Sequence, residues 1–323
     1  MKIGKIPESV LKRSVLKNIK SKHENIKNGA GVGSDCAVFC CNEGFVAQSV
    51  QTYVLQEESH IRYAIIKAVN SIVLSGAKPQ SLLLSLVLPT EAEEKNLQDV
   101  MKAADACAKE YGMQIAGGHT MVADVKEIIA TVTVSGTLLS YEDRLALAKP
   151  GQDIVVSKWI GLEGTALLAG GNEDKLATRY PLHMIEEAAG FDGYLSITEE
   201  AHLARMQGVT ALHDVSTGGI FAALWEMAER AGVGLNVDLK KIPVRQETVE
   251  VCEFFGISPY ELLSGGSLLM AADDGEALVA ALAEANIMGT VIGKITDNND
   301  RVVINEDEKR FLERPRTDEI TKI

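Results

Sequence analysis

The residues best suited to chemistry lie in one short stretch, TALHDVSTGGIF, at positions 210–221. An apolar run ends there at Asp214, and Ser216 is followed by the pair Gly218 and Gly219 before an amphipathic segment begins. Glycines let backbone N–H groups approach an anion closely, and a helix N-terminus favours negative charge. Asp, Ser and Thr are also the usual caps of an ordinary helix. The stretch therefore predicts a phosphate-binding loop with Asp214 as its catalytic carboxylate, or a plain helix start with Asp214 as the N-cap.

Three further stretches combine glycine with polar residues at the end of an apolar run. They are GAGVGSDCAVF at 29–39, AVNSIVLSGA at 68–77 and AGGHTMVADV at 116–125. Each is a candidate ligand-binding loop, although paired glycines are also common in plain turns. The residues expected to contact a ligand there are Gly33, Asp35, Asn70, Gly117, Gly118 and Thr120.

Two histidines stand beside these glycines, His119 after the pair at 117–118 and His213 before Asp214. Imidazole titrates near neutral pH, so both are candidate acid–base groups, and His119 is our catalytic candidate together with Asp214. For His213 the competing interpretation is a hydrogen-bonded histidine near a sheet end. For Asn70 it is a solvent-exposed position on a helix.

Hydrophobic periodicity predicts the helices and strands that must position these residues. An apolar stripe from Ile61 to Ile72 predicts a helix that ends at Gly76. Helix and strand signals then alternate along the chain. Strands are expected at 82–88 (buried), 113–118, 127–138, 153–157, 233–239, 267–272, 289–295 and 301–305, and helices at 91–112, 161–171, 221–232, 245–256 and 276–286. Both halves therefore read as α+β or mixed α/β.

The expected domain boundary is LAKPGQDIVVS at 146–157, where Pro150 and Gly151 interrupt the pattern. A chain of 323 residues is long enough for two domains. We expect an N-terminal domain at 1–148 and a C-terminal domain at 149–323.

Composition excludes several classes of function. A net charge of -13 argues against nucleic acid or an anionic membrane as the main partner. The five cysteines form no CxxC pair, which argues against zinc and dithiol chemistry. A charged amphipathic N-terminus and the lack of a long apolar run favour a cytoplasmic protein.

The glycine stretches, in this order and at these separations, resemble those of the PurM-like (AIR synthase-related) superfamily, nearest within it to the hydrogenase-maturation dehydratase HypE. The HypE motifs GDDAA, TTDS, VNDLAMMGA, TGDT and DPTRGG correspond to residues 33–37, 50–52, 69–71, 118–120 and 214–219. The resemblance implies a PurM-like two-domain fold, with an N-terminal α/β domain whose sheet pairs in a homodimer and a C-terminal α+β domain. It also implies ATP between the domains, Mg²⁺ held by N-terminal aspartates, and maturation partner proteins.

The sequence departs from that pattern at the metal site. Ser34, Gln51, Ser71 and His119 stand where HypE has aspartates, and only Asp35 remains as a candidate magnesium ligand. Mg²⁺ prefers hard carboxylate oxygens, so we expect weak magnesium binding and impaired phosphoryl transfer.

The tail departs as well. HypE ends in Pro-Arg-Ile-Cys, whereas here Pro315 and Arg316 are followed by TDEITKI and the last cysteine is Cys252. We therefore expect no chemistry through a tail thiolate. Two hypotheses remain: an ATP-dependent maturation or ligase-type enzyme with an altered substrate, or a catalytically impaired nucleotide-binding or scaffold relative that acts through partners.

Overall fold

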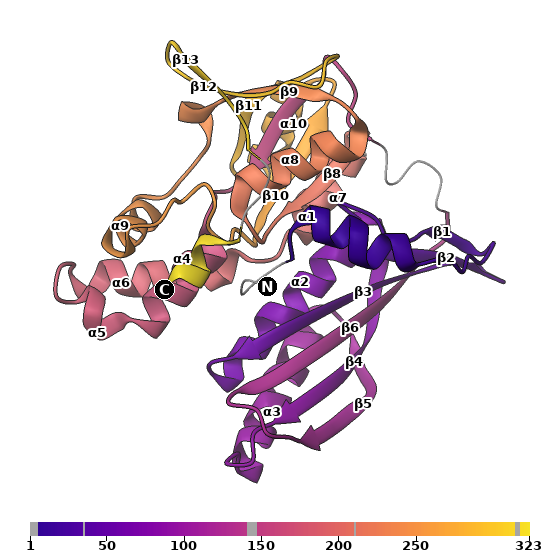
Figure 1. Cartoon of the computed structure of the whole chain (residues 1–323), viewed down its shortest axis with the longest axis vertical. Helices are drawn as coiled ribbons and strands as arrows, with labels where there is room; N and C mark the ends of the chain where they lie inside the picture. The colour runs from indigo at the N-terminus through magenta and orange to yellow at the C-terminus, as the bar shows by residue number, and fades with distance from the viewer. Residues whose placement is uncertain (1–5, 35, 141–146, 210, 314–316) are drawn as a thin grey trace. The chain divides into compact units, whose positions relative to one another are not determined.

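The computed structural model describes residues 6–34, 36–140, 147–209, 211–313 and 317–323 (Figure 1). Its described residues fall into two compact units. The N-terminal unit lies within 21–30 and 34–142, and the C-terminal unit lies within 1–20, 31–33 and 143–323. The first residues of the chain thus group with its second half.

A six-stranded mixed sheet forms the N-terminal unit, as far as it is described. In spatial order its strands are β1 (Ile26–Asn28), β2 (Ala37–Cys41), β3 (Gly44–Leu55), β6 (Ile128–Leu138), β4 (Lys78–Leu88) and β5 (Gln114–Val122). Only β4 and β5 pair in parallel.

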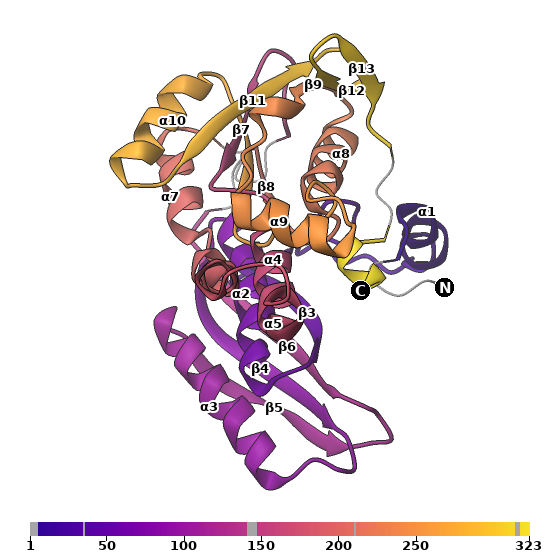
Figure 2. The same ribbon diagram turned by 90° about the vertical axis from the view of Figure 1, so that its left-hand side faces the viewer.

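Helices cover one face of this sheet and leave the other open (Figure 2). The covering elements are η3 (Glu58–His60), α2 (Ile61–Leu74) and α3 (Glu94–Glu110). Along β4, Leu82, Leu84 and Leu86 are buried, whereas Leu83 between them is half exposed. The apolar run at 82–88 is therefore buried on one face only, because strand side chains alternate between the two faces of the sheet.

Strand β5 contains the glycine pair that we expected in a loop at 116–125. Its register against β4 shifts between Leu82 and Leu83, which brings the two backbones together at Gly118. A Cβ atom at Gly118 would lie 1.8 Å from the carbonyl oxygen of Leu84. Gly118 therefore has a structural reason to be glycine, independent of any ligand.

The C-terminal unit is built on a seven-stranded mixed sheet, within the described ranges. In spatial order its strands are β13 (Glu308–Phe311), β12 (Arg301–Asn305), β9 (Gly234–Asp238), β11 (Gly289–Thr296), β7 (Asp153–Ser157), β10 (Ser267–Ala272) and β8 (Ala211–Val215). Strands β7 and β8 both run antiparallel to β10, which lies between them. The carboxyl ends of β7 and β8 therefore point to the same edge of the sheet.

Helix α8 (Gly219–Ala231) packs on one face of this sheet, and α7 (Thr198–Met206) and α10 (Gly275–Glu284) lie on the other (Figure 2). A second apolar cluster joins α4 (Leu162–Gly171), α6 (Leu182–Ala189) and α9 (Gln246–Phe255). Short elements complete the unit: α5 (Glu173–Leu176), η4 (Gly190–Tyr194), η5 (Leu239–Lys241) and η6 (Glu319–Lys322). No helix in the described ranges is long and apolar enough to cross a bilayer.

The N-terminal segment packs against α8 through polar contacts. It forms α1 (Glu8–Val10), η1 (Leu11–Val15) and η2 (Leu16–Asn18). The Trp225 indole donates to the Glu8 carboxylate at 3.2 Å, and Glu229 pairs with Lys12 at 2.8 Å and with Arg301 at 2.7 Å. Hydrogen bonds from Lys12 and then Arg301 lower the pKa of Glu229 to about 2. These contacts explain why residues 6–20 group with the second half of the chain.

We predict that Gly118→Ala destabilises the protein by about 3 kcal/mol or more, because β4 and β5 must separate to admit the methyl group. Gly112→Ala is the matched control: Gly112 has φ +63 and no atom within 4 Å of the place its new methyl group would take, so only about 1–2 kcal/mol is expected. Urea unfolding of the two variants provides the comparison. Equal losses would contradict the close approach at Gly118.

Candidate functional site

The stretch at 211–221 forms the end of β8, a turn and the start of α8. The N-cap of α8 is Gly218, with φ +85 and no side-chain cap, and Gly219 also has a positive φ of +67. Asp214 is 7% exposed and lies inside β8, paired with Leu268 of β10. The N-cap interpretation of Asp214 is therefore wrong. The helix begins later because left-handed glycines make the turn, at positions where a side chain would be strained.

His213 has a structural role, which is the alternative to acid–base catalysis that we considered for it. It is 4% exposed, and its Nε2 lies 3.3 Å from Oε2 of Glu226 on α8. A histidine held in this way ties the strand to the helix that follows it. The structure thus confirms the interpretation of a hydrogen-bonded histidine near a sheet end.

Several loops meet at the edge where β7 and β8 end. The N–H group of Ser264 donates to the carbonyl oxygen of Ser216 at 3.2 Å, and the N–H group of Gly161 donates to the Ser264 hydroxyl at 2.7 Å. This edge, where the loops after β7 and β8 meet the SGGS stretch, is therefore the candidate site of the C-terminal unit. Sequence reasoning missed the SGGS stretch at 264–267, although its paired glycines were a visible signal.

A carboxylate of the chain itself occupies this edge. Asp318 is 3% exposed and accepts from the N–H groups of Gly218 at 2.6 Å, Leu263 at 3.1 Å and Ile320 at 3.0 Å. The glycine turn therefore does bind an anionic group, as its pattern predicts, but that group comes from the C-terminal tail. Asp318 is also the second residue after Arg316, the place that the resembled tail gives to cysteine.

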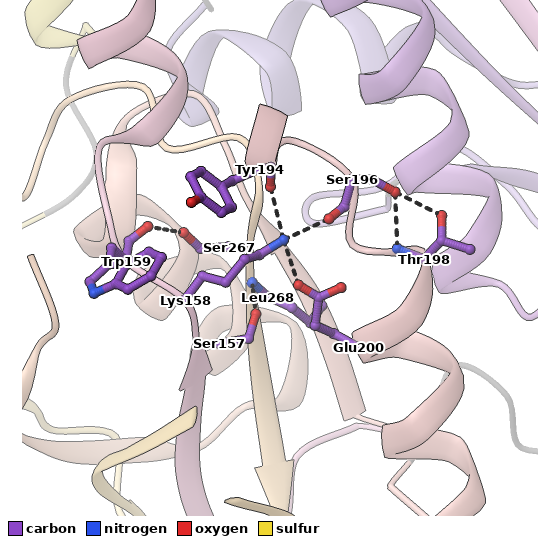
Figure 3. Close-up of polar contacts among 9 residues, drawn as sticks. All are labelled: Ser157, Lys158, Trp159, Tyr194, Ser196, Thr198, Glu200, Ser267 and Leu268. Atoms are coloured by element: carbon purple, nitrogen blue, oxygen red, sulfur yellow. Dashed lines mark hydrogen bonds and ion pairs between the residues drawn. The ribbon is translucent and has the colours of Figure 1, made fainter. Parts of the chain in front are cut away.

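A buried lysine lies at the same edge (Figure 3). Lys158 directly follows β7, has an unfavourable φ of +54, and is 8% exposed. Its ammonium group donates to the carbonyl oxygens of Tyr194 at 2.8 Å and Ser196 at 2.6 Å, and pairs with Glu200 at 2.5 Å. Three donors thus meet three oxygen acceptors, which fixes the 194–200 segment against the end of β7.

The electrostatics of Lys158 reflect its burial. Burial lowers its pKa below the ordinary value of 10.5, while the charges of Glu200 and then Asp214 act to raise it. The lysine therefore brings positive charge to the surroundings of the Asp214 carboxylate. Our sequence reasoning did not single out Lys158, and the signal available was a lysine inside the apolar run DIVVSKWIG.

The described residues do not fit a magnesium site. The Ser34 hydroxyl donates to the carbonyl oxygen of Gly29 at 3.0 Å, and the Ser71 hydroxyl donates to that of Lys67 at 3.1 Å. Both hydroxyls are thus engaged within their own segments. In the part of the chain that the structure describes, no three His, Cys, Asp or Glu side chains gather as a metal cluster. Asp35, the one remaining candidate ligand, lies outside the described residues.

The remaining candidates separate into different places. Gly33 has φ +66, and its carbonyl oxygen accepts from Nη1 of Arg230 on α8 at 3.1 Å, so it lies beside the helix that Gly218 begins. Asn70 is buried in α2, so a merely solvent-exposed position is wrong. His119 is exposed, and its pairing with Ser85 places it on the sheet face opposite α2.

Comparison with known proteins explains this combination of domains. Residues 30–138 match the N-terminal domain, and residues 149–305 the C-terminal domain, of AIR synthase related proteins. The chain belongs to the AIR synthase-related family. It is 25% identical to a putative hydrogenase expression/formation protein of Methanocaldococcus jannaschii, over 99% of this chain and 97% of that protein.

Solved structures confirm the PurM-like fold of this family member. The chain matches a structure of a HypE–HypF complex with a TM-score of 0.77 and 20% identity, over 95% of this chain and 100% of that chain. It matches HypE in complex with ATP with a TM-score of 0.71 and 18% identity, over 97% and 96% of the two chains. At 20% and 18% identity, these two matches establish the fold of the chain and not its activity.

We predict that Lys158→Met lowers the free energy of unfolding by about 3–5 kcal/mol, because it leaves the Glu200 carboxylate buried without its cation. The double variant Lys158→Met/Glu200→Leu should recover part of that loss, which a double-mutant cycle by urea unfolding measures. The exposed pair Lys240–Glu306 is the control, and Lys240→Met should cost less than about 1 kcal/mol. A loss at Lys158 no larger than that at Lys240 would contradict this account.

Proposed function

We propose that this chain binds ATP, or another phosphate-bearing ligand, as a HypE-like relative in which magnesium-dependent phosphoryl transfer is impaired. It would act through maturation partner proteins. The observation that carries the proposal is the state of Ser34 and Ser71, whose hydroxyls donate to backbone carbonyl oxygens where the resembled enzymes have metal-binding acids. Without a bridging cation, the charge that develops on a transferred phosphoryl group loses its main electrostatic stabilisation.

Phosphate binding itself has separate support. A turn with left-handed glycines leads into α8 at Gly218, and the positive end of a helix of 13 residues favours an anion there. The carbonyl oxygen of Gly33 accepts a hydrogen bond from Arg230 of the same helix, and the guanidinium group of Arg230 adds positive charge there. The ligand-binding roles of Asn70, Gly117, Gly118 and Thr120 remain part of this proposal.

A second candidate is an ATP-dependent enzyme with an altered substrate. It is favoured by the buried Asp214, whose charge interacts with that of Lys158. In that case Asp214 would be a catalytic carboxylate and His119 an acid–base group, with Asp35 holding what metal is bound. Release of phosphate from ATP in step with a second substrate would distinguish the enzyme from a binding protein.

We predict that calorimetric titration with ATP gives similar affinities with Mg²⁺ and with chelator, within about threefold. Asp35→Asn should leave both values unchanged, because a single carboxylate gives little metal affinity. A gain of about tenfold or more with Mg²⁺ that Asp35→Asn removes would instead support the enzyme. If no ATP binds under either condition, nucleotide binding is wrong.

We further propose that the chain forms a homodimer through the open face of the N-terminal sheet. Apolar side chains on that face are exposed, among them Val54 at 53% and Leu83 at 48%. A polar row crosses it, in which Thr52 hydrogen-bonds to Thr131 at 3.0 Å and Ser85 pairs with His119. A second copy would cover the apolar positions and would bring His119 into a protein interface.

Light scattering should accordingly give twice the chain mass of 34.8 kDa. Leu83→Asp and Val54→Asp should each shift the protein to monomer, since a buried unpaired carboxylate is costly. Met206→Asp is the control, because Met206 is 69% exposed on the C-terminal unit. Monomeric wild-type protein, or dimeric variants at both sheet positions, would contradict this interface.

A further inference from the structure

The C-terminal tail is attached to the glycine turn by acidic side chains. Besides the three N–H groups on Asp318, the Glu319 carboxylate accepts from the N–H group of Ser258 at 3.2 Å. The N–H group of Glu319 donates to the carbonyl oxygen of Glu261 at 3.3 Å. The described tail, residues 317–323, holds one short helical turn and ends at the half-exposed Ile323. The tail is therefore held by these polar contacts and by Ile320, which packs against the apolar cluster of α4, α6 and α9.

The geometry around Asp318 is that of an oxyanion site. Two N–H groups from separate loops, Gly218 at the start of α8 and Leu263 before the SGGS stretch, converge on the two oxygens of one carboxylate. The third donor, Ile320, belongs to the tail and would leave with it. Carboxylate and phosphate oxygens accept from the same kind of donors, so both can bind at this pair of N–H groups.

We propose that the tail is a built-in competitor, in which Asp318 occupies the anion position that a phosphate group of the ligand takes when the tail leaves. The proposal rests on the proposed binding of a phosphate-bearing ligand and adds its regulation. The apparent association constant of a ligand that needs this position is its association constant for tail-released molecules multiplied by the fraction of molecules in that state. Partner proteins that capture the tail would therefore increase ligand affinity without touching the ligand.

The first test is calorimetric titration of the full-length chain with ATP in the presence of chelator. Asp318→Ala, and a chain that ends before residue 317, should both bind ATP more tightly than the wild type, by about tenfold or more. Asp274→Ala is the matched control: Asp274 also caps a backbone N–H group in this unit, that of Ala277 at 3.0 Å, and its loss should not change ATP affinity.

The second test uses the unmodified chain, so that it holds even if a variant fails to fold. Hydrogen exchange should show ATP increasing exchange in the tail peptide while the peptide that contains Gly218 stays protected. ATP binding with equal affinity in all variants and an unchanged tail would overturn the competitor and leave the proposed function standing. No ATP binding by the wild type or the variants would overturn both. Measurable binding by the wild type that is about tenfold or more tighter in the variants that lack Asp318 would support both.

Discussion

A buried ammonium group is the constraint on which the arrangement of the candidate site depends. Lys158 has a disfavoured backbone conformation and little contact with solvent, so its charge must be matched by oxygen atoms of the protein. The atoms that match it come from residues 194–200, some forty positions along the chain. This match fixes the loop before α7 and gives the end of β7 a positive charge, beside which the Asp214 carboxylate of β8 remains buried. The loops that carry the glycines can then pack against a rigid edge.

The distribution of negative charge along this chain differs from that of the acidic motifs that it resembles. Carboxylates that the resembled family places in its N-terminal domain are replaced by hydroxyl, amide and imidazole groups, and Ser34 and Ser71 use theirs to hold their own backbone. In the other unit, the carboxylate of Asp318 on the tail accepts from backbone N–H groups. The chain thus keeps the architecture of an anion site while the groups that hold a cation are depleted.

The sequence predicted correctly those helices and strands whose bounds depend only on neighbouring residues. The helix at 61–74 and the strand at 153–157 agree with the sequence, because apolar spacing and terminal glycines define them without reference to distant residues. Asp214 could not be placed in this way, because a capping residue and a strand residue look alike until the turn glycines are located. The loop expected at 116–125 is largely strand, since pairing with β4 extends β5 beyond the glycines. The contacts of Lys158 and Asp318 join residues far apart in sequence, and no local pattern encodes them.

The long-range attachment of the N-terminal segment determines when the molecule can be completed during synthesis. Residues 34–142 hold nearly all the strands and helices of the N-terminal unit, so that unit can form as soon as they leave the ribosome. Glu8 and Lys12 have their partners at Trp225 and Glu229, 217 residues later. Residues 6–20 can therefore take their place only after residues 225–229 have been made, and until then they lack their partners on α8. The sheet of the N-terminal unit can thus form before residues 6–20 find their polar partners on α8.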